Sequence, residues 1–455
     1  MSDSRELKKI ISKENKVLKG SAFLTDDINK KKDRESYMFE NMDKNLAFIE
    51  AKKNDNNNTE NLLKEFQKKY RSYRNEWNTQ PTKCIKNKFL KEDLINNNIN
   101  PLCVDIEIAS ICDLACPFCY REFIVTPDKI IDDKLCYNLI DQAAELGVPS
   151  MKFNWRGEPL LNPKIYDYIK YAKEKGILET IINTNATNLT EKNSEKLIKS
   201  GLDLIIYSFD GGSKETYEKM RPGRFKHNSF EKVYENIKNF KKVRDKLNAK
   251  LPFTKIQMIL TKDTFEEVNN FFKLFNNYVD DVNVNQYSER GGEISDLSDV
   301  DKIKYNELIN KYKLPNNTPY MKDINGELSI SKGREPCKQP YQRLLVTYEG
   351  KVAMCCYDWG ANHTVGFSDK KAFSNESDYD QIEENVKNKK KGFELLKDIK
   401  PGKNWNNPEK KVETLKDIWI GDEINKVRKS HCEGKGENVA ICEKCTFKDV
   451  YNWSQ

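Results

Sequence analysis

The sequence predicts an α/β fold, a partial (β/α)6 TIM-like barrel, with a helical extension before it and a small α+β domain after it. From residue 103 onward, short apolar runs alternate with amphipathic segments. Six strand candidates each have a helix candidate next to them in the chain, which implies a parallel sheet with right-handed crossovers. Eight such units would close a full barrel, so six predict an open, partial one.

The individual elements follow from the apolar runs and their boundaries. Strands are expected at 104–109, 151–155, 180–184, 204–209, 254–260 and 282–287. Helices are expected near 133–146, 163–175, 190–200, 229–247 and 264–278. Gly176 and Gly201 stop the second and third of these helices, because glycine is the usual residue just past a helix end.

Residues 1–98 are expected to form a charged, helical N-terminal extension. Within 60–77, apolar and aromatic side chains recur at three- and four-residue spacing, as they do on one face of an amphipathic helix. The barrel is then expected to occupy residues 99–315.

The remainder, 316–455, is expected to be a separate C-terminal domain. A loop rich in proline and asparagine at 315–319 predicts the boundary. Beyond it we expect a hairpin within 344–355 and a helix near 415–430. A Lys-rich insertion is expected near 368–413, where the sequence is charged and only weakly periodic.

Composition excludes several classes of protein. The 455 residues have a mean hydropathy of -0.81, and no apolar run approaches the roughly 20 residues that a membrane span needs. The 78 basic and 71 acidic residues are interspersed, which is too even a balance to indicate nucleic-acid binding. No export signal opens the chain, so we expect a cytoplasmic protein with neither membrane nor nucleic acid as a partner.

The cysteines indicate metal ligation or catalysis, because the cytosol keeps thiols reduced. Twelve are present, and they fall into two groups. The first contains Cys112, Cys116 and Cys119 within the stretch ICDLACPFCY, directly after the first barrel strand. That position is the carboxyl end of the sheet, where α/β barrels place their chemistry.

Three thiolates without a fourth ligand fit an iron-sulfur cluster. A zinc site needs four protein ligands, or three that include histidine, and the only histidines are His227, His363 and His431. On a 4Fe-4S cube, three thiolates leave one iron without a protein ligand. An open iron can bind a cofactor.

The second group combines Cys337 and Cys355 with the later pair Cys442 and Cys445. Two plus two thiolates can complete a tetrahedral zinc site or bind all four irons of a cube. The spacing alone does not choose between them. Cys356 and Cys432 are left over and are expected to be structural, although either could replace one of the four.

The motif C-x3-C-x2-C, with Phe118 before its last cysteine, resembles the signature of the radical S-adenosylmethionine (SAM) enzymes. The resemblance implies that the open iron chelates SAM, and that reductive cleavage gives a 5'-deoxyadenosyl radical that abstracts a hydrogen from the substrate. It also implies a flavodoxin or ferredoxin as electron donor.

Further motifs at the ends of later strands resemble the SAM-binding positions of that family. The segment Trp155 to Pro159 resembles its GGEP motif, with Arg156 where the first glycine is usual. The others are Asn183 to Ala186, near the ribose, and Ser208 to Gly211 with Arg221, which hold the methionyl carboxylate. The resemblance thus implies these cofactor-binding residues: Phe118, Tyr120, Arg156, Gly157, Glu158, Asn183, Asn185, Ser208, Asp210 and Arg221.

The C-terminal region resembles the domain called SPASM in its shortened Twitch form, which makes it a small α+β cluster-binding domain. The resemblance rests on the four cysteines of the second group, on the segment before Cys355, on Ile418-Trp419 and on Arg428. It implies one auxiliary 4Fe-4S cluster ligated by Cys337, Cys355, Cys442 and Cys445. Cys356 is an alternative hydrogen donor, as in some epimerases of the family.

The resemblance covers about residues 100–450 and predicts an enzyme. We expect it to act on a small polar substrate, a sugar, aminocyclitol or alcohol, by dehydrogenation, epimerisation or rearrangement, in polysaccharide or secondary-metabolite biosynthesis. One alternative is a maturase of a ribosomally made peptide. Another, of a different class, is a non-catalytic, metal-stabilised binding protein.

Overall fold

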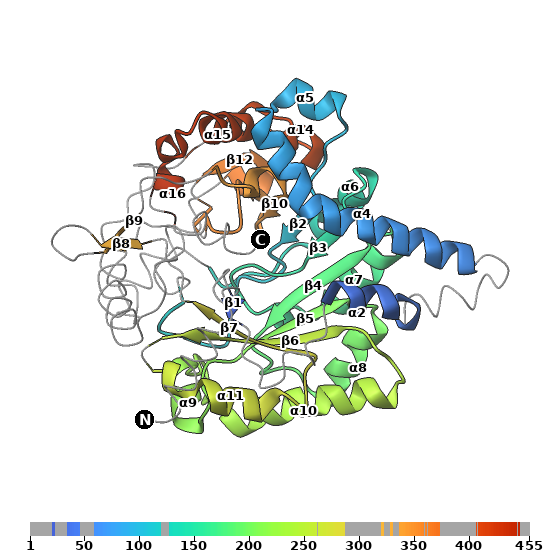
Figure 1. Ribbon diagram of the computed structural model, residues 1–455, viewed down its shortest axis with the longest axis vertical. Helices are drawn as coiled ribbons and strands as arrows, with labels where there is room; N and C mark the ends of the chain where they lie inside the picture. The colour runs from blue at the N-terminus through green and yellow to red at the C-terminus, as the bar shows by residue number, and fades with distance from the viewer. Residues whose placement is uncertain are drawn as a thin grey trace.

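The structure is a computed structural model of the whole chain (Figure 1). Its description covers residues 21–22, 34–45, 59–119, 127–261, 263–286, 320–322, 328–330, 336–358, 360–361, 363–373, 406, 408–443 and 445. Most of the Lys-rich insertion and Tyr120 lie outside these residues. Within the described part of the chain, no helix has the length and apolar character that a membrane crossing requires.

Six parallel strands form the centre of the sheet, as expected. They pair in the chain order of a partial barrel, each with the next. They are β2 (Cys103–Ile106), β3 (Ser150–Lys152), β4 (Glu179–Thr184), β5 (Leu204–Ser208), β6 (Phe253–Leu260) and β7 (Asp281–Gln286). The sheet is open, because its first and last strands do not pair with each other. The prediction of an open α/β barrel is confirmed.

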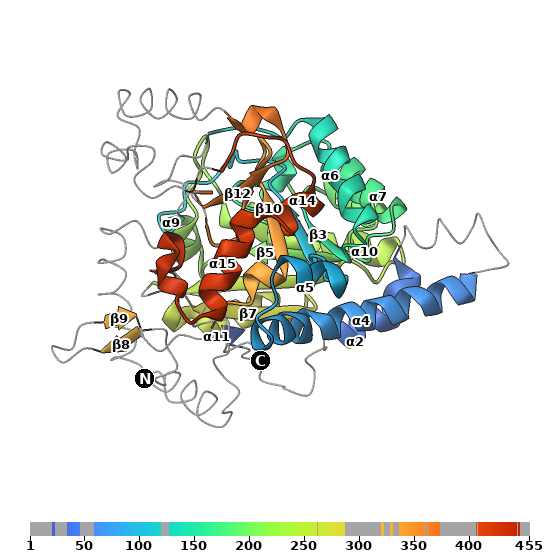
Figure 2. The ribbon, with the colours of Figure 1, turned by 90° about the horizontal axis from the view of Figure 1, so that it is seen from above.

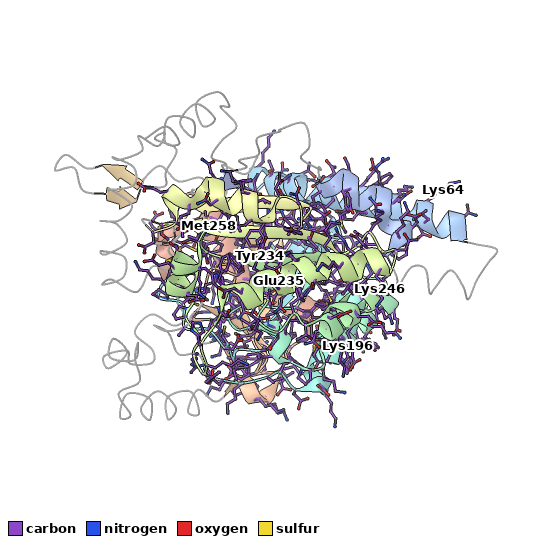
Figure 3. All side chains as sticks on the ribbon, turned by 90° about the horizontal axis from the view of Figure 1, so that it is seen from below. Lys64, Lys196, Tyr234, Glu235, Lys246 and Met258 are labelled. Atoms are coloured by element: carbon purple, nitrogen blue, oxygen red, sulfur yellow. The ribbon has the colours of Figure 1, made fainter. Side chains whose placement is uncertain are left out.

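Helices between these strands cover the outer face of the sheet (Figure 1). Polar side chains start several of them: Asp132, Thr190 and Ser229 each accept a hydrogen bond from a backbone N–H in the first turn. Seen from below in Figure 3, α10 runs across the outer face with Tyr234, Glu235 and Lys246 along it. The helices are α6 (Asp133–Glu145), α7 (Ile165–Glu174), α8 (Glu191–Lys199), α9 (Lys214–Met220), α10 (Phe230–Lys246) and α11 (Val268–Phe275).

The C-terminal strands extend the same sheet. Strand β10 (Arg343–Val346) pairs with β2 in parallel, so that Leu345 lies beside Asp105. The expected hairpin joins β10 to β11 (Lys351–Ala353), and β12 (Thr364–Phe367) adds a further antiparallel strand. The barrel and the C-terminal region therefore share one continuous sheet, whereas the expected boundary at 315–316 lies outside the described residues.

Two of the expected helices differ from the prediction. The segment near 415–430 forms two helices, α14 (Leu415–Trp419) and α15 (Asp422–Cys432), separated at Ile420 and Gly421. A short helix, α16 (Ala440–Glu443), follows. In the N-terminal extension the helix α4 (Thr59–Lys86) continues through Pro81, well beyond the expected end at 77. Lys64 lies near its outer end in Figure 3.

The N-terminal extension closes the amino end of the sheet. Helices α2 (Arg34–Asn41) and α4 lie side by side (Figure 2), and α5 (Lys91–Asn96) follows. Met38, Tyr70 and Tyr73 pack in one apolar cluster with Leu204 and Phe253, which are the first residues of β5 and β6. The carboxyl ends of the strands are left for the candidate site.

A buried carboxylate fixes this closure. Glu179, the first residue of β4, is fully buried and forms an ion pair with Arg34 of α2. Its second oxygen accepts a hydrogen bond of 2.9 Å from the Tyr73 hydroxyl of α4. Burial would raise the pKa of Glu179, but the Arg34 and Arg74 cations and the hydrogen bonds hold that pKa below its usual value.

We predict that Glu179→Gln lowers the free energy of unfolding by about 3 kcal/mol, because it leaves a cation at a buried site without its carboxylate. The difference from the unmodified protein should narrow in acid, since a carboxylate with a lowered pKa stabilises the fold above its unfolded-state pKa and loses that effect as the pH falls. Denaturant unfolding at several pH values measures both effects.

The matched control is Glu195→Gln. Its partner Lys199 is one helical turn away, and the two side chains are 46% and 54% exposed. An exposed pair of this kind contributes less than about 0.5 kcal/mol. Equal losses in the two variants would contradict the role assigned to Glu179.

Candidate active site

A cavity opens at the carboxyl ends of the parallel strands. It is lined by the loop after β2 and by residues at or just beyond the ends of β3 to β6. All predicted first-site residues that the structure describes line it: Cys112, Cys116, Phe118, Cys119, Arg156, Gly157, Glu158, Asn183, Asn185, Ser208, Asp210 and Arg221. The structure therefore brings the separate motifs together, and only Tyr120 lies outside the described residues.

Two neighbouring segments hold the cysteine loop in place. On one side, Ala115 donates its backbone N–H to the Pro222 carbonyl at 2.9 Å, and Arg224 donates to the Asp113 carbonyl at 2.8 Å. On the other, the Asp113 carboxylate accepts hydrogen bonds from the Asn185 amide at 2.8 Å and from the Thr187 hydroxyl at 2.6 Å. Asn185 thus positions the cysteine loop.

The thiols themselves suit a cluster that brings positive charge. Burial, and then the neighbouring Cys116, raise the pKa of Cys112 well above its ordinary value. Thiolates are the ligand form, so these groups favour a bound metal centre that compensates their charge. In the described part of the chain, no three His, Cys, Asp or Glu side chains are arranged around a single metal ion. A cube differs from such a site, because each thiolate binds a different iron.

Gly157 packs directly on the backbone of the segment that leads into the cysteine loop. A Cβ at this position would lie 2.4 Å from the carbonyl oxygens of both Ala109 and Ile111. The next residue, Glu158, donates its N–H to the Ile111 carbonyl at 2.8 Å. A glycine is therefore required for this close approach.

The Glu158 carboxylate joins the ends of two strands. It accepts hydrogen bonds from the Thr184 hydroxyl and the Asn185 N–H, both at 2.7 Å, and from the Leu160 N–H at 3.1 Å. Burial raises its pKa to about 7, with a further contribution from Asp113, although these hydrogen bonds act in the opposite direction.

Arg221 is held by a carboxylate from the end of β5. Its Nε lies 2.7 Å from Oδ2 of Asp210, and the other oxygen of Asp210 accepts the Ile259 N–H at 2.6 Å. The guanidinium group lies over the Phe118 ring, 5.6 Å from its centre, and one nitrogen is 4.0 Å from the Cys116 sulfur. Arg221 is thus fixed beside the cysteine loop with its cation facing the cavity region.

Asn183 places a buried hydrogen-bond acceptor at the cavity wall. Its backbone N–H donates to the Asn154 side chain at 2.7 Å. Its own side-chain oxygen is buried and finds no partner in the described part of the chain. A buried acceptor on a cavity wall favours a ligand with a hydroxyl donor, such as a ribose.

Sequence reasoning missed two important residues near this site. Glu107 is fully buried and binds both Nε and a terminal nitrogen of Arg156, at 2.6 and 2.7 Å. Trp155 lines the cavity, and the Arg156 guanidinium lies 4.3 Å from its ring centre. The sequence did contain a signal for Glu107, because it is an acidic residue within an apolar run. A carboxylate buried in such a run needs a cation or a hydrogen-bond donor as its partner.

Three of the four cysteines of the second group lie near one another. Burial raises the pKa of Cys355, and the nearby thiols of Cys356, Cys445 and Cys442 raise it further. Cys337 lies close to α15, since its backbone N–H donates to His431 at 3.4 Å. Soft thiol donors from two parts of the chain, Cys355 and the pair Cys442 and Cys445, therefore lie near one another.

The two remaining cysteines of this region differ in their surroundings. The Cys432 sulfur lies 3.2 Å from the Tyr341 hydroxyl, in an apolar cluster with Cys84. Cys356 lies next to the second group, and its sulfur is 3.7 Å from the Gln339 side-chain oxygen. Of the two, Cys356 is the one placed to replace a ligand or to face the cavity wall.

We predict that Gly157→Ala displaces the cysteine loop, because no side-chain movement can relieve a contact with two backbone carbonyls. Iron content per chain after anaerobic reconstitution should fall markedly, with a lower thermal midpoint. Gly176→Ala is the control. That glycine has a φ of +88° but open space around it, so the substitution costs about 1 kcal/mol of stability and leaves the iron content unchanged. Full iron loading of Gly157→Ala would refute the packing argument.

Comparisons with known proteins agree with this geometry. Residues 106–275 match the family model described as the radical SAM superfamily. A tungsten-containing aldehyde ferredoxin oxidoreductase cofactor-modifying protein of Pyrococcus furiosus is 25% identical over 261 residues, which are 55% of this chain and 69% of that protein. An AdoMet-dependent heme synthase of Methanosarcina barkeri is 29% identical over 178 residues, 38% of this chain and only 47% of that protein.

A solved structure is similar over a longer part of the chain. The structure of SuiB of Streptococcus suis bound to its precursor peptide SuiA matches this chain with 19% sequence identity and a TM-score of 0.47. The matched region is 78% of this chain and 73% of the SuiB chain. The family match runs from the last residue of β2 to the end of α11 and so contains the cysteine loop and every strand end that lines the cavity. By this family match, residues 106–275 form a radical SAM domain.

Proposed function

We propose that the protein reductively cleaves SAM and uses the resulting radical to oxidise, epimerise or rearrange a small polar substrate. The observation that supports this most directly is the cysteine loop at the cavity wall, with Arg221 and the buried Asn183 oxygen in the same cavity. This combination offers three thiols to a metal cluster, and a cation and a buried acceptor to a second ligand bound beside it.

In this proposal Cys112, Cys116 and Cys119 hold a 4Fe-4S cluster whose fourth iron binds SAM. The bound pair supplies a 5'-deoxyadenosyl radical when the cluster gives SAM an electron. The chain's own residues orient the cofactor: Arg221 neutralises the methionyl carboxylate, and Ser208 and Asn183 bond to polar groups. Glu158 and Gly157 keep the backbone of their loop against the cysteine loop.

The proposal includes an auxiliary 4Fe-4S cluster held by Cys337, Cys355, Cys442 and Cys445, in a C-terminal domain of the Twitch type. The proximity of three of these thiols supports it. The same proposal divides the chain into parts at residues 98 and 315. It also includes a cytoplasmic location and a flavodoxin or ferredoxin as electron donor. A reducing compartment would keep the cysteines available as ligands.

A small polar substrate is favoured by the inner surface of the sheet. Ser208, Gln257 and Asn283 are neighbours across β5, β6 and β7, and the first two line the cavity. Asn283 is fully buried, and neither polar atom of its side chain finds a hydrogen-bond partner in the described part of the chain. A ligand with several hydroxyl or amino groups would satisfy such positions.

Two alternatives stay open. A ribosomally made peptide would also present polar backbone groups to this surface, so peptide maturation is the second candidate within the same chemistry. A non-catalytic, metal-stabilised binding protein is the candidate of a different class. The cavity with its three thiols argues against that last alternative, because a structural metal site needs no open ligand position.

We predict that replacing Cys112, Cys116 and Cys119 together by alanine abolishes SAM cleavage, measured as 5'-deoxyadenosine formed with dithionite. Iron should fall from about eight to about four atoms per chain, because the auxiliary cube remains. Cys136→Ala is the control, since that buried cysteine lies on α6 away from the cavity. Formation of 5'-deoxyadenosine by the triple variant would overturn the proposed chemistry.

We further predict that 5'-deoxyadenosine formation rises when a small polyhydroxylated or amino-substituted compound is added to reconstituted enzyme. Panels of sugars, aminocyclitols and peptides should be assayed in parallel, with mass spectrometry of each compound. Stimulation by peptides alone would replace the small-molecule proposal with the maturase alternative. Zinc without sulfide in anaerobically purified protein would instead favour the binding protein.

A further inference from the structure

The segment Trp155-Arg156-Gly157 lies between the two groups of cysteines. At one end, Gly157 packs on the backbone that leads to the first group. At the other, the Trp155 indole N–H donates to the Cys356 carbonyl at 2.9 Å, next to Cys355 of the second group. Three consecutive residues therefore contact both sites.

Apolar packing reinforces the Trp155 contact. The indole belongs to a small cluster with Leu345 of β10, Ala353 of β11, Ala361 and the partly buried Cys356. Only 8% of Trp155 is exposed, and yet it lines the cavity. Its ring is thus the wall between the cavity and the chain segment that carries Cys355.

Arg156 holds the Trp155 ring in position. Its guanidinium lies over the indole and binds the buried Glu107 with two hydrogen bonds. The same Glu107 carboxylate also accepts the Tyr348 N–H at 3.3 Å, in the turn that joins β10 to β11. Glu107 and Arg156 therefore hold the cavity loop and the β10–β11 turn in one arrangement.

We propose that Trp155 is a positioning residue for the auxiliary cluster, with Arg156 and Glu107 holding its ring in place. This inference rests on the auxiliary cluster of the proposed function. The potential of an iron-sulfur cluster depends on nearby hydrogen bonds and on access of water. The indole controls both at the Cys355–Cys356 segment, because it bonds to the backbone there and separates it from the cavity.

The test uses the Cys112→Ala, Cys116→Ala, Cys119→Ala protein, in which only the auxiliary cluster can form. In this background, Trp155→Phe keeps a ring but removes the N–H, and Trp155→Ala also opens the wall. We expect four irons per chain in each, a shifted electron paramagnetic resonance spectrum of the reduced cluster for Trp155→Phe, and a higher midpoint potential for Trp155→Ala. Water would stabilise the more highly charged reduced cluster.

Trp419→Phe is the matched control. The Trp419 indole also donates to a backbone carbonyl, that of Ile99, at 2.8 Å, but this residue does not line the cavity. It should lose similar stability and leave the spectrum and potential unchanged. Iron-loaded Trp155 variants with the spectrum and potential of the background would overturn the inference and leave the auxiliary cluster standing. Absence of iron from the background protein would overturn the inference together with the proposed cluster.

Discussion

The parallel pairing of β2 with neighbours on both sides is the constraint on which the site depends. β2 lies between β3 and β10, and it runs parallel to each. The loops that follow these three strands therefore leave the same edge of the sheet side by side. They are the segment that carries Trp155 and Arg156, the cysteine loop, and the turn before β11. Their adjacency follows from strand direction, although 240 residues of chain separate Cys103 from Arg343 in the β2–β10 register.

Buried ion pairs give this arrangement its specificity. Arg156 with Glu107 and Arg221 with Asp210 are pairs whose side chains are less than 10% exposed. Such pairs contribute little net stability, because the loss of hydration offsets most of the attraction. A single misplaced partner, however, leaves a buried charge unpaired at a cost of several kcal/mol. Alternative positions of these loops are therefore disfavoured more strongly than the correct position is stabilised.

Local patterns in the sequence predicted most strands and helices of the barrel. Contacts between segments far apart in the chain could not be predicted from such patterns. Strand runs and helix starts such as Thr190 and Ser229 depend on neighbours within a few residues, and they were found. The pairing of β10 with β2 leaves no local periodicity, so the C-terminal strands were expected to form a domain of their own. Arg156 was recognised by its place in a motif, but its partner Glu107 lies directly after β2, 49 positions earlier in the chain.

Buried polar side chains lie toward both ends of the sheet, and two sets of them differ in their partners. At the amino end, Glu179 has partners for both oxygens, and aromatic side chains of α2 and α4 cover the strands around it. At the carboxyl end, the Asn183 oxygen and the Asn283 amide are equally buried but lack partners in the described part of the chain. Unsatisfied groups of this kind cost free energy in the folded protein. The Asn183 oxygen lies at the cavity wall, so a ligand that donates a hydrogen bond to it would remove this cost.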